Sequence, residues 1–166
     1  MTEADVERLL RELHDQGVKF IIIGGMAAIA QGSAYLTADL DLCYSRDKKN
    51  LANLAKALTP FHASLRDAPA NLPFSLDLPT LRAGLNFTLS TDFGDLDLFG
   101  EVLGLGSYKK AVEFSEELEL FGLSCKVLTL EGLVKTKEAT ARPKDQRLLP
   151  ELKALLELQR SQKKES

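Results

Sequence analysis

The sequence predicts an α/β (α+β) domain built on a small mixed β-sheet that is flanked by helices and closed by a C-terminal helical pair. Two observations predict this class. Runs that are rich in β-branched residues or alternate polar and apolar residues, such as 18–23 and 39–44, are typical of strands. Segments such as 6–13 and 51–58 have apolar residues every three or four positions, as in amphipathic helices. Strands and helices that alternate along a chain indicate a sheet covered by helices.

The length and composition of the chain fit a single domain. A chain of 166 residues buries roughly two-thirds of its unfolded surface, so its core needs no disulfide or metal to support it. Hydrophobic residues make up 45% and charged residues 27%, as in ordinary globular proteins. We expect one domain over residues 1–160, followed by a polar tail at 161–166 that frays.

The first elements are marked by local signals. A helix is expected to begin after Thr2, because Thr2 and Asp5 have the spacing of a capping box. The next run, 18–23, is rich in β-branched residues and is typical of a buried strand. This strand stops abruptly at Gly24 and Gly25.

The rest of the chain can be divided in the same way. A short helix is expected at 26–31 and a second strand at 39–44, after which Asp47 caps a helix that stops at Pro60. Residues 68–79 contain three prolines and no clear period, which indicates a long irregular connection. Further elements are expected in this order: a strand pair at 85–89 and 96–99, a helix at 108–118, a hairpin at 119–128, and helices at 130–141 and 145–159.

The charge is unevenly distributed. The whole chain has a net charge of −3, but the part from Lys135 onwards carries +4 and the remainder −7. An acidic body with a basic C-terminal part fits a metal site that faces a phosphate-binding element. A solvated basic tail explains the same charge distribution equally well.

Cysteine usage and hydropathy indicate a cytoplasmic protein. Cys43 and Cys125 lie in apolar strand-like runs, which favours buried free thiols in a reducing compartment. The cysteines and histidines have no zinc-ligand spacing. The N-terminal segment lacks the pattern of a signal peptide, and no apolar run is long enough to span a bilayer. We therefore expect no membrane partner.

Two copies of an acidic–apolar alternation carry the candidate chemistry. In a strand, Asp39 and Asp41 point to the same face, while Leu40 and Leu42 point to the other. Two carboxylates on one face repel each other, and a divalent cation between them relieves this repulsion. The same pattern returns at 95–98, so a strand lying beside the first would bring a third carboxylate to the same cations.

The Gly24-Gly25 pair is a candidate phosphate-binding turn. Glycines between a strand and a helix let backbone N–H groups approach a phosphate closely. A tight turn that needs positive φ angles is the purely structural alternative. The spacing matches neither a dinucleotide-binding fingerprint nor a Walker loop.

Taken together, these motifs resemble a known family. The run IIIGGMAAIAQGSAYLTADLDL, residues 21–42, is similar to the signature of the nucleotidyltransferase superfamily typified by DNA polymerase β. Within it, the chain most resembles small bacterial proteins related to abortive-infection nucleotidyltransferase toxins. The segment KTKEATARPKDQRLLPEL, residues 135–152, is similar to their closing element. The resemblance extends over residues 18–156.

The resemblance implies the nucleotidyltransferase fold and a role for each matching residue. Gly24 and Gly25 match the pair that contacts the nucleotide phosphates. Asp39 and Asp41 match two metal ligands. Asp97 matches the third carboxylate, which shares a metal and, in active members, assists deprotonation of the attacking hydroxyl. The implied cofactor is Mg²⁺ or Mn²⁺, bound together with a nucleoside triphosphate.

Other positions match the family less directly. Asp95 replaces Asp97 if the register is shifted by two residues. Thr37 matches a small polar position before the aspartates and is expected to contribute to nucleotide binding. Tyr35 stands where many similar sequences have an arginine. The closing basic motif, whose cations would neutralise triphosphate charge, is matched by Lys137, Arg142, Lys144 and Asp145. Asp145 also fits an N-cap of the last helix.

The expected activity is transfer of a nucleoside monophosphate from a nucleoside triphosphate to a hydroxyl acceptor. The acceptor would be an RNA or tRNA end, or a partner protein. The alternative is a catalytically silent nucleotidyltransferase-fold binding module or a toxin–antitoxin component. The substitution of Tyr35 favours this alternative, whereas the three carboxylates favour the enzyme.

Overall fold

The structure is a computed structural model that describes residues 1–69, 71–140 and 142–165, without the side chains of residues 144 and 145. In this part of the chain, the main sheet has seven strands. Their order across the sheet is β3 (Ser64–Leu65), β4 (Asn86–Thr91), β5 (Gly94–Phe99), β2 (Asp39–Tyr44), β1 (Phe20–Ile23), β9 (Leu123–Leu128) and β8 (Ser115–Leu120). The sheet is mixed, because β2 is parallel to β5 and antiparallel to β1.

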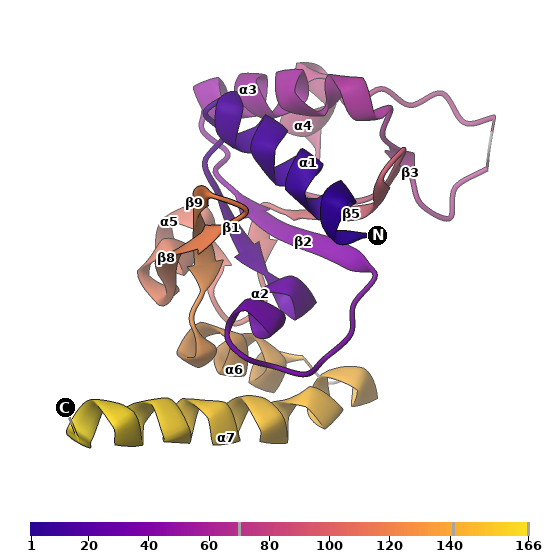
Figure 1. The fold of residues 1–166 in the computed structure, drawn as a ribbon. Helices are drawn as coiled ribbons and strands as arrows, with labels where there is room; N and C mark the ends of the chain where they lie inside the picture. The colour runs from indigo at the N-terminus through magenta and orange to yellow at the C-terminus, as the bar shows by residue number, and fades with distance from the viewer. Residues whose placement is uncertain (70, 141, 166) are drawn as a thin grey trace.

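Helices lie on both sides of this sheet (Figure 1). Above it in that view are α1 (Glu3–Asp15), α3 (Lys48–Leu58) and α4 (Leu78–Ala83). Below it are α2 (Gly24–Ala30), α6 (Leu130–Ala139) and α7 (Pro143–Glu165). The predicted architecture, a mixed sheet flanked by helices with a closing helical pair, is confirmed.

The N-terminal helices begin where the sequence indicates. At α1, the Asp5 N–H donates to Thr2 Oγ1 at 3.1 Å, and the Thr2 N–H donates to Asp5 Oδ2 at 2.8 Å. This is the predicted capping box. The carboxylate of Asp47 accepts from the Asn50 N–H at 2.8 Å and caps α3. A short 3₁₀ turn, η1 (Thr59–Phe61), follows α3 at the predicted proline stop.

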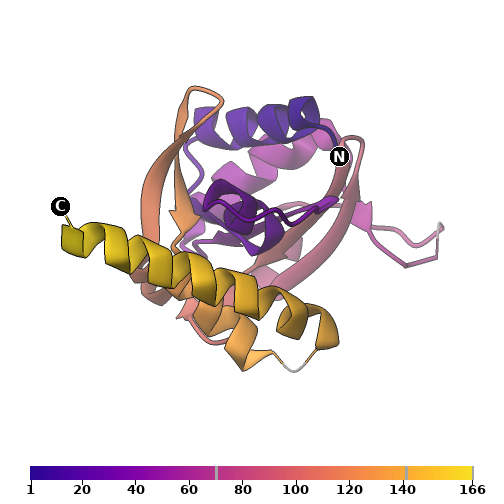
Figure 2. The ribbon, with the colours of Figure 1, turned by 60° about the horizontal axis from the view of Figure 1, so that its bottom comes forward.

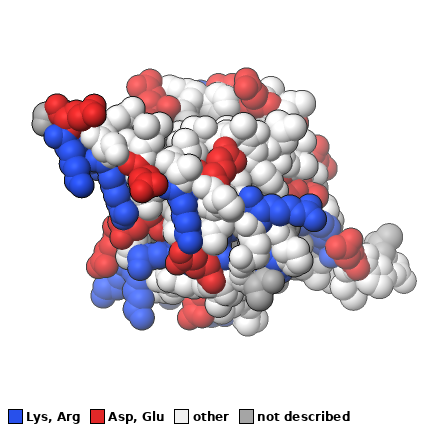
Figure 3. All heavy atoms as spheres, turned by 90° about the horizontal axis from the view of Figure 1, so that it is seen from below, with Lys and Arg blue, Asp and Glu red and all other residues white. Residues whose placement is uncertain are grey.

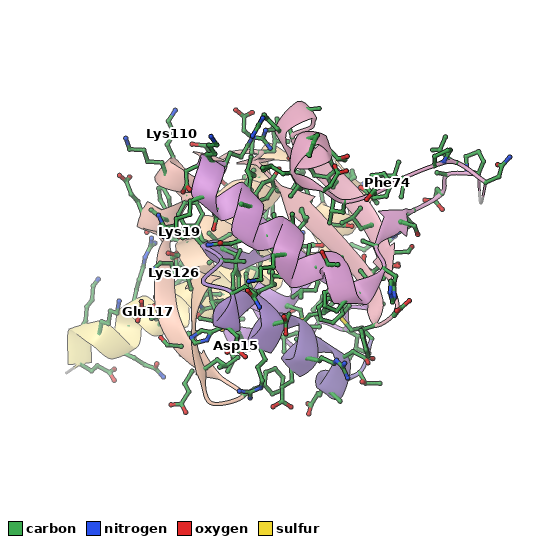
Figure 4. All side chains as sticks on the ribbon, turned by 90° about the horizontal axis from the view of Figure 1, so that it is seen from above. Asp15, Lys19, Phe74, Lys110, Glu117 and Lys126 are labelled. Carbon is green, nitrogen blue, oxygen red and sulfur yellow. The ribbon has the colours of Figure 1, made fainter. Side chains whose placement is uncertain are left out.

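The middle of the chain contains more regular structure than its prolines indicate. The predicted irregular connection at 68–79 ends earlier, because Asp77 caps α4 through the Thr80 N–H at 2.9 Å. Part of the segment between β3 and α4 extends away from the body of the molecule, whereas Phe74 in the same segment packs against the core (Figure 4). A small second sheet pairs β6 (Glu101–Val102) with β7 (Gly106–Ser107).

The predicted helix at 108–118 is wrong over its second half. Helix α5 (Tyr108–Ala111) and the 3₁₀ turn η2 (Val112–Phe114) are followed directly by β8, which begins at Ser115. Strand β8 alternates acidic and apolar residues over 117–120 and pairs along its whole length with β9. The ion pair between Glu117 and Lys126, 3.3 Å long, lies across this pairing (Figure 4).

The last helix runs across the lower side of the molecule (Figure 2). It is helical as far as Glu165, so it continues into the segment for which fraying was predicted. The face that α7 covers carries Lys and Arg interspersed with Asp and Glu (Figure 3). No helix in the described residues is both long and apolar enough to cross a bilayer.

Candidate functional site

The register between β2 and β5 brings four carboxylates onto one face of the sheet. Asp39 is opposite Asp95, and Asp41 is opposite Asp97. Neighbouring strands lie about 4.8 Å apart, so the paired aspartates are direct neighbours. The intervening residues are fully buried on the opposite face: Leu40, Leu42, Leu96 and Leu98. The structure thus brings Asp39, Asp41 and Asp97 together, with Asp95 beside Asp39.

The Gly-Gly turn begins next to these carboxylates. Ile23, the last residue of β1, is paired with Asp41, so the chain turns away from the sheet beside the Asp41 side chain. Gly24 has a φ of +64°, and a β-carbon at this position would overlap with Asp41 Oδ2. Both the backbone conformation and the space therefore require glycine at position 24.

Gly25 is required for a different reason. A β-carbon at position 25 would lie 2.8 Å from Thr37 Cβ and 3.0 Å from Tyr35 Cε1. Thr37 also accepts a hydrogen bond from the Asp39 N–H at 3.3 Å, which fixes the start of β2. Tyr35, which replaces the expected arginine, therefore packs against the glycine turn.

Arg66 is a residue of this site that the sequence did not reveal. Its Nη2 atom donates to Asp97 Oδ1 at 2.7 Å and to the Leu89 carbonyl at 2.7 Å. Its Nε atom lies 3.3 Å from Asp95 Oδ2. The side chains of Arg66 and Asp97 are only 19% and 18% exposed. A largely buried cation therefore lies within the acidic face.

Pairing of β3 with β4 places Arg66 there. Ser64 and Leu65 pair with Ser90 and Leu89, and the Arg66 N–H donates to the Thr88 carbonyl at 3.0 Å. Strand β3 has only two residues, too few to give a periodic signal in the sequence. Only the long-range pairing of strands identifies Arg66.

Burial and charge shift the pKa values of this pair. Burial raises the pKa of Asp97, and the charges of Asp39 and Asp95 act in the same direction, against the opposing effect of Arg66. Burial alone would lower the pKa of Arg66, but the hydrogen bond to Asp97 and the three carboxylates raise it. Arg66 thus stays charged, and it compensates the charge of the acidic face only in part.

The predicted basic residues come from the closing helical pair. Lys137 lies on α6 and is partly buried, whereas Arg142 is exposed just before α7. The side chains of Lys144 and Asp145 lie outside the described residues. The roles of Lys137, Arg142 and Lys144 in nucleotide binding stay predictions.

The donor chemistry of the site fits a hard divalent cation. Mg²⁺ prefers carboxylate oxygens and commonly takes one or two from a protein, with phosphate oxygens completing its shell. Asp39 and Asp41 supply two such groups on one strand. Among the described residues, however, no group of three or more acidic, histidine or cysteine side chains is arranged to hold a metal ion. Asp97, the predicted third carboxylate, forms an ion pair with Arg66 at 2.7 Å.

Solved structures with the same architecture are nucleotidyltransferases. The lincosamide antibiotic adenylyltransferase LnuA, bound to lincomycin, has a TM-score of 0.61 and 13% identity, over 93% of this chain and 98% of that chain. The antibiotic-resistance factor ANT(2'')-Ia has a TM-score of 0.57 and 12% identity, over 96% and 91%. An antigenic nucleotidyltransferase-like protein from Paracoccidioides brasiliensis has a TM-score of 0.54 and 14% identity, over 94% and 76%.

At the level of sequence, no family model matches the chain, and a search of curated proteins finds no match. The similarity therefore lies in the fold, and it extends over nearly the whole chain. It agrees with the resemblance carried by the Gly-Gly turn and the paired aspartates. The chain has the nucleotidyltransferase fold.

Proposed function

We propose that the protein is a metal-dependent nucleotidyltransferase that moves a nucleoside monophosphate from a nucleoside triphosphate to a hydroxyl acceptor, releasing pyrophosphate. The observation that carries this proposal is the parallel pairing of β2 and β5, which puts Asp97 beside Asp41. The Gly24 turn adjoins the same carboxylates. Nucleotidyltransferases with the same fold support the general reaction.

Each residue has a distinct role in this proposal. Asp39 and Asp41 would hold Mg²⁺ or Mn²⁺, with Asp97 as the third ligand. The cation would neutralise charge at the phosphates. Asp97 would also accept the proton of the acceptor hydroxyl, or orient that hydroxyl for in-line attack.

The glycine turn and the basic closing segment would bind the triphosphate. Gly24 and Gly25, which have no side chains, would let the backbone N–H groups of the turn approach a phosphate oxygen closely. Lys137, Arg142 and Lys144 would neutralise the remaining phosphate charge. Thr37 would hold the turn in place through its contact with Gly25.

Several acceptors are compatible with this chemistry. An RNA or tRNA end and a partner protein both offer hydroxyl groups. One protein of the same fold is a lincosamide antibiotic adenylyltransferase, so a small hydroxylated molecule is a third class to test. Transfer to any of them requires the same phosphoryl chemistry.

A second candidate is a catalytically silent module of the same fold that binds a partner, for example as a toxin–antitoxin component. Two observations favour it. Arg66 forms an ion pair with Asp97, and Tyr35 replaces the arginine of many similar sequences. A silent module would not transfer nucleotide, whatever it binds.

A thermal stability assay separates these functions. The full-length protein is heated with Mg²⁺ or Mn²⁺ and each nucleoside triphosphate in turn, and compared with the Asp39→Ala/Asp41→Ala variant. Ligand at about 100 times its Kd stabilises the native state by about 2.7 kcal/mol, so the wild type should melt higher only when both ligands are present. The double variant should not respond, whereas Glu119→Ala, at an exposed position of β8, should respond like the wild type.

Transfer is then measured directly. The protein is incubated with labelled nucleoside triphosphate and total RNA, cell lysate or small hydroxylated molecules, and covalently bound label is counted. Label that depends on Asp39 and Asp41 supports the enzyme. Stabilisation by nucleotide without any transfer supports the silent module, and no response in either assay contradicts the proposed function.

A further inference from the structure

Arg66 lies in the position of a counter-ion at the acidic face. Its guanidinium contacts Asp97 and Asp95 on β5, and Asp39 on the neighbouring strand acts on it electrostatically. Four carboxylates share this face of the two strands. A guanidinium is planar and offers several N–H donors to oxygen acceptors, so it suits such a cluster.

We propose that Arg66 is a built-in counter-cation that must release Asp97 when a divalent cation and its nucleotide bind. This inference rests on the proposed function, because it assumes that the carboxylates bind such a cation. It adds a competition: the ion pair occupies Asp97 Oδ1, an oxygen that a metal ion at this carboxylate would also use. Arg66 then sets the affinity of the site for divalent cations and keeps the nucleotide-free site from binding them tightly.

The competition follows from charge and space. Arg66 Nη2 is 2.7 Å from Asp97 Oδ1, a distance that leaves no room for a cation between the two atoms. Repulsion between a guanidinium and a divalent ion is strong where both are largely removed from water. Because both side chains are more than four-fifths buried, Arg66 and a cation at Asp97 Oδ1 exclude each other.

The surroundings of Arg66 allow its side chain to leave. Among the described residues, Nη2 has two acceptors, Asp97 Oδ1 and the Leu89 carbonyl. The Nε atom is buried and makes no hydrogen bond of good geometry, although it lies 3.3 Å from Asp95 Oδ2. The chain leaves the sheet directly after Arg66, at Asp67. Phosphate oxygens of the incoming nucleotide are suitable acceptors for the released guanidinium.

The test measures binding of Mn²⁺ alone to the full-length protein, by the electron paramagnetic resonance of free Mn²⁺. Arg66→Gln removes the competing charge, so its Kd for Mn²⁺ should be about tenfold lower than that of the wild type. This change corresponds to a difference of about 1.4 kcal/mol in binding free energy. Arg66→Lys keeps the charge but has one nitrogen in place of the Nη2 and Nε atoms that face Asp97 and Asp95, so its Kd should lie between the two. Arg11→Gln, which removes an exposed arginine paired with Glu7, should bind like the wild type.

Each outcome has a defined meaning. If Arg66→Gln binds Mn²⁺ with the wild-type Kd or more weakly, the competition is wrong, while the proposed function stands. If neither protein binds Mn²⁺, with or without nucleoside triphosphate, both proposals fail. Circular dichroism establishes that the variants are folded. Should Arg66→Gln not fold, an unchanged Kd in Arg66→Lys overturns the inference and a lowered one supports it.

Discussion

Gly24 lies against the carboxylate of Asp41, so closely that a β-carbon at position 24 would overlap with Asp41 Oδ2. Gly24→Ala should therefore lower the free energy of unfolding by more than the roughly 1–2 kcal/mol that a left-handed conformation costs an ordinary residue, because the Asp41 side chain must also move. The same variant should lose the stabilisation by metal and nucleotide. Urea denaturation and thermal melts with and without ligand measure the two effects.

Gly122 provides a matched control for this prediction. Its φ is +75°, close to that of Gly24, and an added β-carbon meets no atom within 4 Å. Gly122→Ala therefore isolates the backbone cost and should leave the ligand response intact. Equal losses of stability in the two variants would show that contact with Asp41 is unimportant.

Asp39 is expected to lower the stability of the metal-free protein but to be required for binding of metal and nucleotide. It belongs to an acidic face that Arg66 neutralises only in part, so Asp39→Asn should raise the free energy of unfolding by about 0.5 kcal/mol in the absence of divalent cations. It should also abolish the stabilisation by metal and nucleotide. Glu119→Gln, which removes one negative charge at an exposed site of β8, is the control. A loss of stability in metal-free Asp39→Asn would contradict the predicted repulsion.

Asn50 links β1 and β2 at the ends of the two strands that lie away from the site. This side chain is 2% exposed. It accepts from the Lys19 N–H at 2.6 Å and donates to the carbonyls of Lys19 at 3.1 Å and Ser45 at 2.7 Å. Asn50→Ala removes the side-chain partner of the Lys19 N–H and of the Ser45 carbonyl, whereas the Lys19 carbonyl still accepts from the Ser45 N–H at 3.2 Å. The substitution should therefore lower the free energy of unfolding by about 2–4 kcal/mol. Urea denaturation checks this, and the exposed Lys49→Ala should change stability little.

The two cysteines should be unreactive in the native protein. Burial raises the pKa of Cys43 from its ordinary 9.0 to about 12 and also raises the pKa of Cys125. Neither thiol should react with an aromatic disulfide reagent at pH 8 until the protein is unfolded in guanidinium chloride. Because the unfolded thiol ionises first, the contribution of Cys43 to stability is complete below pH 9 and is lost as the pH rises towards 12. Rapid labelling of the native protein would contradict this burial.

Local signals predicted much of the fold. The alternation in 39–44 predicts β2 to the residue, because each carboxylate there alternates with a buried leucine. The capping box at Thr2 and Asp5 marks the start of α1, and it could be predicted because it depends only on residues close in sequence. The three candidate carboxylates could be named because the pattern on β2 recurs on β5.

The features that the sequence did not predict depend on contacts between segments that are distant in the chain. Residues 115–118 continue a plausible helix by composition, but pairing with β9 makes them a strand, so tertiary structure overrides local preference. Arg66 is an isolated cation next to a two-residue strand, and only the pairing of β3 with β4 carries it to Asp97. Neither contact has a signature in the nearby sequence.

Because aspartate and leucine alternate in β2 and β5, burial of the leucines in the core also fixes which face of the sheet carries the carboxylates. Sliding β5 by one residue would turn its carboxylates inward and expose leucines that are now fully buried. Exposing each leucine costs about 1.5–3 kcal/mol. Exposing several of them would use up most of the free energy of unfolding of a domain of ordinary stability. A variant of this protein that still folds with its native core must therefore keep these strand positions on the face opposite the leucines, whatever side chains occupy them.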